Sequence, residues 1–412
     1  MISVFGWVVI MSSSALLYHA VKQQANKKVA IIGSGAAGLC VGDAFRQAAE
    51  SSSSPSSVSF TLFEASSSTG GVWKQTKPMY RSLVTNLPVE IMEISQNDPF
   101  KKSSGSSFVG HREVNSYLED FARDHHLMEH IKFDTLVTSV EPVYSEEANL
   151  KWRVSSVKTS PAASSVKKSI ETLDEEVEVD VYDNVVICNG HYSKSFTPRI
   201  EGLEDYPGQS IHSMDYDSDT IREQYGGKRV LLLGARASAM DIAREITSVA
   251  SSVYVSDRSY KYGELASRHY DGKLTHVGGV VRYNAGMFSF TDGSTAKDVD
   301  VIVYCTGYTY DFPFFNTKSS LCDAGDSGRS IDELDGGHKI VEVDQGRAVL
   351  DVYQHIFHHK YPSLAFVGLP WSVVPFHMFY LQARWIAKVY CGELPLHGED
   401  ERQSWLTDHA GE

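Results

Sequence analysis

Two glycine-rich segments carry the residue types that hold nucleotide phosphates. The first follows an apolar run over 29–32, and its residues are Gly33, Ser34, Gly35, Ala36, Ala37 and Gly38. In such a fingerprint the first glycine permits a tight turn, the second lets the backbone approach a pyrophosphate, and the third allows close helix–strand packing. The pyrophosphate would lie at the helix N-terminus, where free N–H groups and the helix dipole attract an anion.

The elements around this fingerprint must form a βαβ unit if it binds a nucleotide. The hydrophobic pattern predicts a buried strand over 29–32, a helix over 39–49 and a second strand over 58–63. Glu64 ends the second strand, where an acid can bind both ribose hydroxyls of an adenosine. It lies later than the usual interval of about 20 residues after the glycines, and the serine-rich tract 51–57 explains the delay as a loop insertion. This order of elements favours a nucleotide site over a structural glycine turn.

The second fingerprint has a similar context but different chemistry. An apolar strand over 230–233 precedes it, and a predicted helix over 240–250 follows it. Its residues are Gly234, Ala235, Arg236, Ala237 and Ser238, followed by Ala239. Arg236 stands where the second glycine is expected. Either the backbone approach differs there, or the arginine side chain contacts phosphate itself.

The residues after the next strand indicate which nicotinamide cofactor the second site prefers. A short strand over 252–255 leads into Ser256, Asp257 and Arg258. An arginine beside a serine hydroxyl can hold the 2′-phosphate of NADPH through charge-assisted hydrogen bonds. Asp257 is a counter-argument, because an acid prefers the bare ribose of NADH, and the alternative for Arg258 is a solvated surface charge. We predict NADPH, bound in part by Ser256 and Arg258.

Two such sites allow one chain to hold two dinucleotides against each other, as electron transfer from a nicotinamide to a flavin requires. We predict an α/β fold of two nested Rossmann-like dinucleotide-binding domains, with the NADPH domain inserted into the FAD domain. The strand over 300–304 is expected to return the chain to the first sheet. The predicted boundaries are 1–26 for an apolar N-terminal segment, 27–192 and 300–395 for the FAD domain, 193–299 for the NADPH domain and 396–412 for a polar C-terminal tail.

Composition narrows the classes of partner and compartment. The formal net charge is −14 and no basic stripe occurs, so nucleic acid is not an expected partner. The five cysteines are widely spaced without a CxxC pair, which is typical of a reducing compartment and argues against a disulfide reductase of the two-dinucleotide type. His355, His358 and His359 lie on an aromatic-rich segment and are interpreted as packing and surface residues, so no metal site is expected.

The N-terminal segment is a candidate membrane anchor. Residues 2–21 contain no Asp, Glu, Lys or Arg, and roughly 20 apolar residues can span a bilayer. Lys22, Lys27 and Lys28 follow and would keep the catalytic body on the cytoplasmic side, with the endoplasmic reticulum as the expected membrane. The serines at 12–14 weaken this interpretation, and the alternatives are a soluble cytoplasmic extension and an incorrect start site.

A motif between the two fingerprints resembles the signature of flavin-containing monooxygenases. Residues 206–216 read YPGQSIHSMDY, an aromatic-x-Gly-x-x-x-His-x-x-x-aromatic pattern that includes Gly208 and His212. Segments 70–73 (GGVW), 80–88 (YRSLVTNLP) and 306–314 (TGYTYDFPF) are also similar to that family. The TNLP sequence and the missing second glycine of the second fingerprint most resemble the plant-type sulfide S-oxygenating branch of the family.

The resemblance implies roles for further residues. Beside the first fingerprint and Glu64, it assigns to FAD binding Gly71, Val72, Trp73, Thr85 and Asn86. Asn86 matches the active-site asparagine of the family and would hydrogen-bond the flavin peroxide or the retained NADP⁺, whereas spacing alone favours a turn residue. His212 is expected to tie the linker between the domains rather than to act as a base.

The resemblance also implies an activity. NADPH would reduce FAD, and the reduced flavin and O₂ would form a C4a-hydroperoxyflavin that oxygenates a small soft nucleophile, a sulfide sulfur or an amine nitrogen. An NADPH oxidase that releases H₂O₂ shares all these motifs and stays an alternative. A catalytically weakened flavin-binding protein is another, for which Arg236 and Ala239 argue. The oligomeric state is open, with a homodimer as one candidate.

Overall fold

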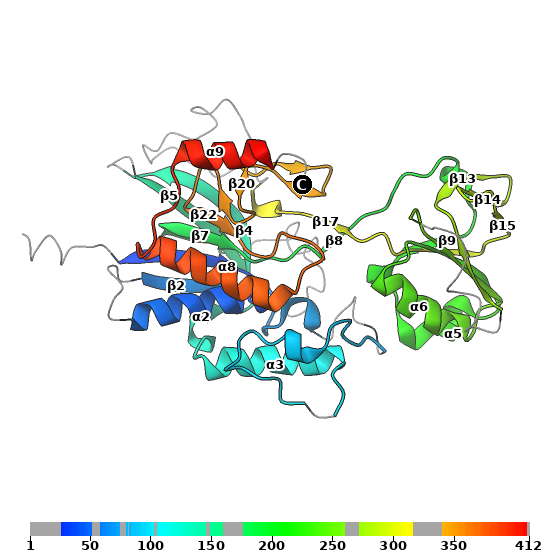
Figure 1. Cartoon of the computed structure of the whole chain (residues 1–412), viewed down its shortest axis with the longest axis horizontal. Helices are drawn as coiled ribbons and strands as arrows, with labels where there is room; N and C mark the ends of the chain where they lie inside the picture. The colour runs from blue at the N-terminus through cyan, green and yellow to red at the C-terminus, as the bar shows by residue number, and fades with distance from the viewer. Residues whose placement is uncertain are drawn as a thin grey trace, which may run out of the picture.

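The computed structural model describes residues 26–51, 58–74, 80, 82–102, 105–145, 149–159, 176–259, 272–315 and 340–409. Figure 1 shows two α/β bodies, joined by connecting segments that contain β8 (Lys194–Ser195) and β17 (Tyr308–Thr309). No helix within the described ranges is both long and apolar enough to cross a bilayer. The candidate anchor over 2–21 lies outside them.

The first body is built on a seven-stranded sheet of order β20-β21-β22-β7-β1-β2-β3. Its strands are β1 (Lys27–Ile32), β2 (Val58–Phe63), β3 (Ile131–Lys132), β7 (Asn184–Ile187), β20 (Val352–Tyr353), β21 (Phe357–His358) and β22 (Leu364–Phe366). Its helices are α2 (Ala36–Glu50), α3 (His111–Asp124), α8 (Pro375–Tyr390) and α9 (Glu399–Asp408). An antiparallel sheet of β4 (Thr135–Tyr144), β5 (Leu150–Lys158) and β6 (Glu178–Tyr182) covers the face opposite α2 and α8 (Figure 1).

Strand β1 shows how the first sheet is buried on both faces. Val29 and Ile31 pack in the core that contains α2 and α8. Ala30 and Ile32 point the other way, into the core shared with β4 and β5. Parallel strands covered on both sides are continuous apolar runs, because alternate side chains enter different cores. This is why the apolar run before the first fingerprint predicts a buried strand.

The second body repeats this arrangement. Its sheet has the order β12-β11-β10-β16-β9 and all its neighbouring strands are parallel. These strands are β9 (Gln209–His212), β10 (Arg229–Leu233), β11 (Ser252–Ser256), β12 (Leu274–Val277) and β16 (Val301–Tyr304). Helices α5 (Ile221–Tyr225) and α6 (Ala237–Thr247) cover one face, and β13 (Val280–Asn284), β14 (Met287–Phe290) and β15 (Thr295–Lys297) cover the other. The prediction of two nested Rossmann-like units is confirmed.

The prediction that the strand over 300–304 returns the chain to the first sheet is wrong. Strand β16 pairs with β10 and β9 inside the second sheet instead of returning to the first. The return runs through β17, which pairs antiparallel with β8. Residues 300–304, which the predicted boundaries assign to the FAD domain, therefore belong to the second body. A run of four buried apolar residues identifies a strand, but it does not identify the sheet that accepts it.

The C-terminal residues also differ from the expected polar tail. Helix α9 packs on β20, where the ring centroids of Trp405 and Tyr353 lie 5.5 Å apart. Arg402 is buried, and its Nη2 donates to the backbone oxygen of His359 over 3.0 Å. One tryptophan and one arginine therefore fix a helix whose other residues are mostly exposed.

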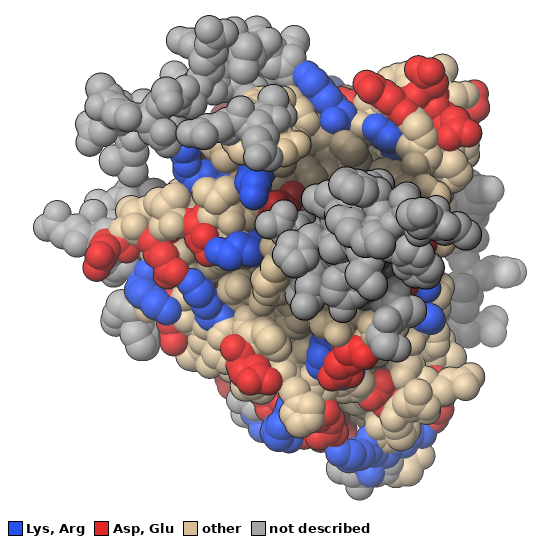
Figure 2. Space-filling view, turned by 90° about the vertical axis from the view of Figure 1, so that its left-hand side faces the viewer, with Lys and Arg blue, Asp and Glu red and all other residues tan. Residues whose placement is uncertain are grey.

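Charges on the surface are mixed in sign. Figure 2 shows Lys and Arg side chains interspersed with Asp and Glu side chains across one face. Several ion pairs on the surface join different elements, such as Lys28 of β1 with Asp180 of β6 over 3.1 Å and Lys151 of β5 with Asp183, which follows β6, over 3.1 Å. Exposed pairs of this kind contribute about 0–1 kcal/mol each. Core packing rather than surface pairing must therefore provide most of the stability.

A partly buried charge cluster makes the stability depend on pH. His125 Nδ1 lies 2.8 Å from Asp43 Oδ1, and Nε2 lies 2.7 Å from Asp98 Oδ1. The hydrogen bond with Asp43 outweighs the effect of burial and, with Asp98, raises the pKa of His125 to about 9. Since this exceeds the unfolded value, the stabilisation is complete below pH ~6.5 and is lost as the pH rises through about 9.

We expect His125→Gln to weaken this dependence. Between pH 6 and pH 9.5 the wild type should lose on the order of 3 kcal/mol more stability than the variant, because a shift of one pKa unit corresponds to 1.36 kcal/mol. Urea unfolding at the two pH values measures the difference. Equal losses in both proteins would show that the cluster does not set the alkaline stability.

Candidate functional site

The first fingerprint makes a turn that only glycine fits. Gly33 has φ +105°, and its N–H donates to Phe63 O over 2.8 Å at the end of β2. A Cβ at Gly33 would lie 2.5 Å from Cys188 O, at the end of β7. The turn is thus held between the carboxyl ends of two strands, which is where open α/β sheets bind ligands.

The second fingerprint has the same geometry. Gly234 has φ +107°, and its N–H donates to Ser256 O over 2.9 Å at the end of β11. A Cβ at Gly234 would lie 2.4 Å from Cys305 O, at the end of β16. Cys305 therefore stands in the second body where Cys188 stands in the first. Each body carries one strand–turn–helix of the type that holds a dinucleotide.

Both helices begin at their fingerprints and leave their first N–H groups without side-chain caps. Helix α2 has Gly35 as N-cap and α6 has Arg236, and neither helix has an acid in its first turn. Each starts three residues earlier than the hydrophobic pattern predicts, at Ala36 and Ala237. Uncapped N-termini without acids are suited to a pyrophosphate.

The two helices approach their turns differently. A Cβ at Gly38 would lie 1.9 Å from Gly33 O, so α2 packs too closely on its turn for any side chain. Ala239 occupies the corresponding place in α6 and is fully buried. Because alanine has a Cβ, α6 cannot approach Gly234 O as closely. Arg236 is exposed and is the N-cap residue of α6.

The GGVW segment lies directly against the first fingerprint. It forms the short helix η1 (Gly71–Trp73), and Gly70 N donates to Ser34 O over 3.3 Å. A Cβ at Gly71 would lie 3.0 Å from the Cα of Gly35, so the two backbones leave no room for side chains between them. Val72 and Trp73 are half-buried beside this contact. A dinucleotide laid along the loop would meet mainly backbone, which fits a bound FAD.

Glu64 lies at the centre of a polar cluster. Its Oε2 accepts from Ser34 N over 3.0 Å and from Ser34 Oγ over 2.8 Å, and its Oε1 accepts from Ser66 N over 3.0 Å. Lys74 Nζ pairs with Oε1 at 3.4 Å. Burial raises the pKa of Glu64, but Lys74 and the hydrogen bonds from Ser66 and Ser34 outweigh burial and hold it below its usual value. An ionised carboxylate at this position can accept the hydroxyls of a ribose.

Lys74 is a site residue that the sequence interpretation missed. Its ammonium group contacts the Ser66 hydroxyl and Ser68 O as well as Glu64. The sequence feature that could have indicated this role is the basic residue directly after the GGVW segment. The serine-rich insertion, except for Ser51, lies outside the described residues.

The end of β11 carries the residues predicted to select NADPH. Ser256 is buried and its hydroxyl donates to Gly278 O over 2.9 Å. Asp257 Oδ1 accepts from the Ser259 N–H over 2.9 Å and from its hydroxyl over 2.8 Å, so one carboxylate oxygen holds a local turn. Arg258 is exposed and makes no ion pair with any other described residue. The geometry leaves the guanidinium accessible to a phosphate.

We expect Arg258→Gln to change the cofactor preference. The KM for NADPH should rise about 10- to 100-fold, as expected for loss of a hydrogen bond to a charged group, whereas the KM for NADH should stay the same. Steady-state kinetics with both cofactors tests this, with Arg222→Gln on α5 as a control for loss of an exposed charge. An equal change for NADPH and NADH would contradict a 2′-phosphate contact.

Thr85 and Asn86 lie on a turn held by the segment before α3. Thr85 is buried, its N–H donates to Val109 O over 2.9 Å, and its Oγ1 accepts from Val109 N over 3.3 Å. Asn86 is exposed, and within the described part of the chain its amide makes no hydrogen bond that would hold the turn. The backbone is therefore fixed while the amide is available to a ligand.

The motif between the fingerprints lies where the chain enters the second sheet. A Cβ at Gly208 would lie 2.6 Å from Asp300 O, so the chain passes close to the start of β16. His212 Nδ1 accepts from Met214 N over 3.1 Å, and Nε2 lies 3.1 Å from Gly307 O, to which it can donate. Burial lowers the pKa of His212, which favours the neutral ring that these two bonds require. Both nitrogens are occupied, which supports a role in joining the connecting segments and not a role as a base.

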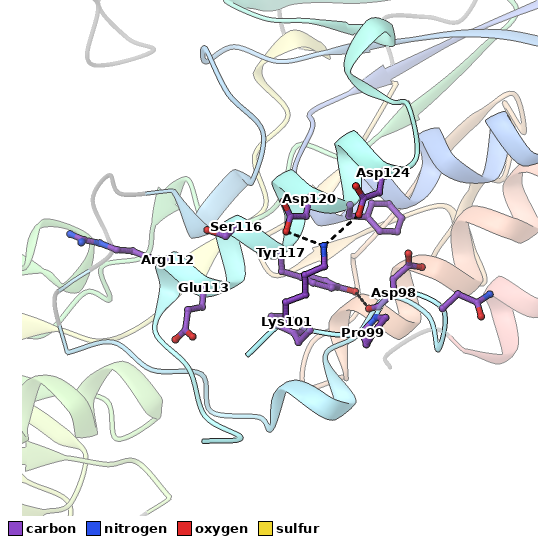
Figure 3. Close-up of a pocket in the computed structure, with 12 residues that line it drawn as sticks. Asp98, Pro99, Lys101, Arg112, Glu113, Ser116, Tyr117, Asp120 and Asp124 are labelled. Atoms are coloured by element: carbon purple, nitrogen blue, oxygen red, sulfur yellow. Dashed lines mark hydrogen bonds and ion pairs between the residues drawn. The ribbon is translucent and has the colours of Figure 1, made fainter. Parts of the chain in front are cut away.

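A cavity of about 340 Å³ lies elsewhere, between residues 97–101 and α3. Figure 3 shows Lys101 beside Asp120 and Asp124, at 3.6 and 3.8 Å, and Tyr117 bonded to Asp98 O. Its lining residues are Asn97, Asp98, Pro99, Phe100, Lys101, Arg112, Glu113, Ser116, Tyr117, Asp120, Phe121 and Asp124. None of the predicted cofactor residues is among them. Among the described residues, no group of His, Cys, Asp and Glu side chains is arranged to hold a metal.

Known proteins are similar to this chain in sequence and in fold. A family model described as flavin-binding monooxygenase-like matches residues 26–273 and 261–326. The flavin-containing monooxygenase FMO GS-OX-like 2 of Arabidopsis thaliana is 34% identical over 405 residues, which cover 91% of this chain and 76% of that protein. The solved S-allyl-L-cysteine S-oxygenase from Allium sativum has a TM-score of 0.75 at 32% identity, covering 94% of this chain and 82% of the other. Tmm from Pelagibacter sp. strain HTCC7211 shares the fold, with a TM-score of 0.68 at 24% identity over 92% of this chain and 79% of the other.

Proposed function

Because the chain belongs to the flavin-binding monooxygenase-like family, we propose that it transfers one oxygen atom from O₂ to the sulfur of a small sulfide, with an amine nitrogen as the second candidate acceptor. As a member it is an oxidoreductase that uses FAD and NADPH. Sulfur is favoured because a relative similar over most of the chain is named as an S-oxygenase.

The residues of the first body fit FAD. The fingerprint backbone from Gly33 to Gly38 would bind the pyrophosphate at the start of α2, and Glu64 would accept the ribose hydroxyls. Lys74 would keep that carboxylate ionised. Gly71 would let the cofactor lie flat against the loop. When bound, the flavin supplies electron transfer from NADPH and the activation of O₂.

The residues of the second body fit NADPH. Its pyrophosphate would bind at the start of α6, where Arg236 adds a charge that the first site lacks. The exposed Arg258 would hold the 2′-phosphate, whereas the Ser256 hydroxyl, which was predicted to share this role, is buried and donates its proton to Gly278 O instead. Asn86 belongs to the chain of the first body. Its amide hydrogens would be donated to an oxygen at the reacting centre, and the hydrogen bonds of the neighbouring Thr85 hold its backbone in place. A fixed donor of this kind stabilises developing negative charge without reorganising.

The repeated geometry of Gly33 and Gly234 carries this proposal, because each turn offers a dinucleotide site at the carboxyl end of a parallel sheet. The test is to incubate the FAD-loaded protein with NADPH, O₂ and either S-allyl-L-cysteine or a tertiary amine. Sulfoxide formed in proportion to the NADPH consumed supports the proposal. H₂O₂ in place of any organic product indicates an NADPH oxidase, and no NADPH consumption indicates a weakened flavin-binding protein.

Residues 2–21 are proposed to attach the enzyme to a membrane, with the body on the cytoplasmic side. The proposal rests on their uncharged composition and on the lysines that follow. Deleting residues 1–26 should move the protein from the membrane fraction to the soluble fraction. An undeleted protein that is found only in the soluble fraction would contradict this.

A further inference from the structure

Tyr80 and Ser82 connect the chain leading to Asn86 with helix α6 of the second body. Tyr80 Oη donates to Asp241 Oδ2 over 2.9 Å. The Ser82 hydroxyl donates to Glu245 Oε1. Besides the connecting segments that contain β8 and β17, these hydrogen bonds are a direct contact between the two bodies.

The Tyr80 side of the contact is buried and packed against aromatic rings, whereas Ser82 is exposed. Tyr80 is 6% exposed, and its ring lies edge-on to that of Tyr216 with centroids 5.7 Å apart. Tyr216 donates to Glu245 Oε2 over 2.6 Å, so Glu245 accepts from both bodies. Leu83 packs against the same core. Burial and the Asp241 carboxylate raise the pKa of Tyr80, and the phenol therefore stays protonated and continues to donate.

One helix carries both this contact and the expected phosphate site. Asp241 and Glu245 are one turn apart on α6, and residues so spaced share a helix face. The N-terminus of the same helix, at Arg236, is where the NADPH pyrophosphate is proposed to bind. A helix of this length moves as a rigid element, so a shift at its N-terminus also shifts Asp241 and Glu245.

The other end of the contact is close to Asn86 along the chain. Ser82 lies four positions before Asn86, and the intervening backbone is paired with the segment before α3 at Val84 and Thr85. The position of α6 and the position of the Asn86 turn are therefore linked by two hydrogen bonds and a short, anchored stretch of chain.

We propose that Tyr80 and Ser82 are positioning residues, which couple dinucleotide binding at the N-terminus of α6 to the placement of the Asn86 amide. This inference rests on the proposed function for the two dinucleotide sites and for Asn86. It assigns to these two residues a task that neither fingerprint performs. When NADP⁺ or NADPH is bound, these two residues would hold the Asn86 turn in the position that places its amide at the reacting centre.

The experiment measures amide hydrogen exchange over residues 82–92 in the FAD-loaded protein, with and without NADP⁺. In the wild type, NADP⁺ should slow exchange in this segment. In the double variant Tyr80→Phe with Ser82→Ala, this protection should fall by about tenfold or more, because two hydrogen bonds to charged groups are lost. FAD absorbance should be retained, because neither residue contacts the first fingerprint.

Matched variants distinguish a loss of the coupling between α6 and the Asn86 turn from a general loss of packing in the protein. Tyr390→Phe removes a buried phenol bond to Pro362 O inside the first body and should leave NADP⁺ protection unchanged. Asp241→Asn keeps an acceptor oxygen and should resemble the wild type, whereas Asp241→Ala removes the acceptor of the Tyr80 phenol and should reduce NADP⁺ protection. Unchanged protection in the double variant, or none in the wild type, would overturn the inference. Absence of sulfoxide with intact protection would instead contradict the proposed function and leave the coupling standing.

Discussion

Replacing Gly35 by valine is expected to abolish FAD retention while the fold is preserved. The backbone at Gly35 is extended, with φ −70°, so a β-branched residue adopts it without backbone strain. A Cβ there would already lie 3.4 Å from the Cα of Gly71, and the further methyl groups would fill the space where the pyrophosphate approaches. Losing one or two hydrogen bonds to a charged phosphate weakens binding by about 10- to 10,000-fold.

The measurement is the ratio of flavin absorbance to protein after gel filtration, followed by titration with added FAD. Gly105→Val is the matched control, because no described residue other than its chain neighbours has a heavy atom within 4 Å of a Cβ at Gly105. Circular dichroism should be the same for both variants. Full flavin occupancy in Gly35→Val would show that the cofactor does not cross this loop.

The second large effect is expected from Asn86→Ala. Since Asn86 is exposed and its amide does not hold the turn, the variant should fold and retain FAD. Removing a fixed donor from a reacting oxygen costs about 100- to 1,000-fold in rate. We therefore expect sulfoxide formation to fall by that factor while NADPH oxidation continues and its electrons appear as H₂O₂.

Product, NADPH and H₂O₂ are measured in the same reaction to test this. Asn284→Ala, which removes an exposed asparagine at the end of β13 in the second body, should behave as the wild type. Undiminished sulfoxide yield from Asn86→Ala would remove this residue from the reacting centre. Loss of FAD would indicate a binding role instead.

Several parts of the site could be predicted from sequence because their signals are local. Gly33 and Gly234 each follow a strand, and a positive φ at that point is accessible mainly to glycine. Strand β2 has the predicted bounds, and both helices exist close to where the apolar spacing places them. Within such a unit the chain itself brings the strand, turn and helix together.

Other parts required contacts between distant segments. Lys74 pairs with Glu64 because η1 folds back on the first fingerprint. Strand β16 lies between β10 and β9, although its apolar run suits either sheet. His125 joins α2 to the loop that carries Asp98, and no local pattern links these three segments.

The two strand–turn–helix units for dinucleotides follow from local sequence patterns, since backbone conformation and hydrophobic periodicity are properties of short segments. Long-range contacts set which sheet receives β16, which cation pairs with Glu64 and which helix contacts Tyr80. Those outcomes depend on packing and hydrogen bonding between residues far apart in the chain, and many sequences of the same local pattern could pair differently.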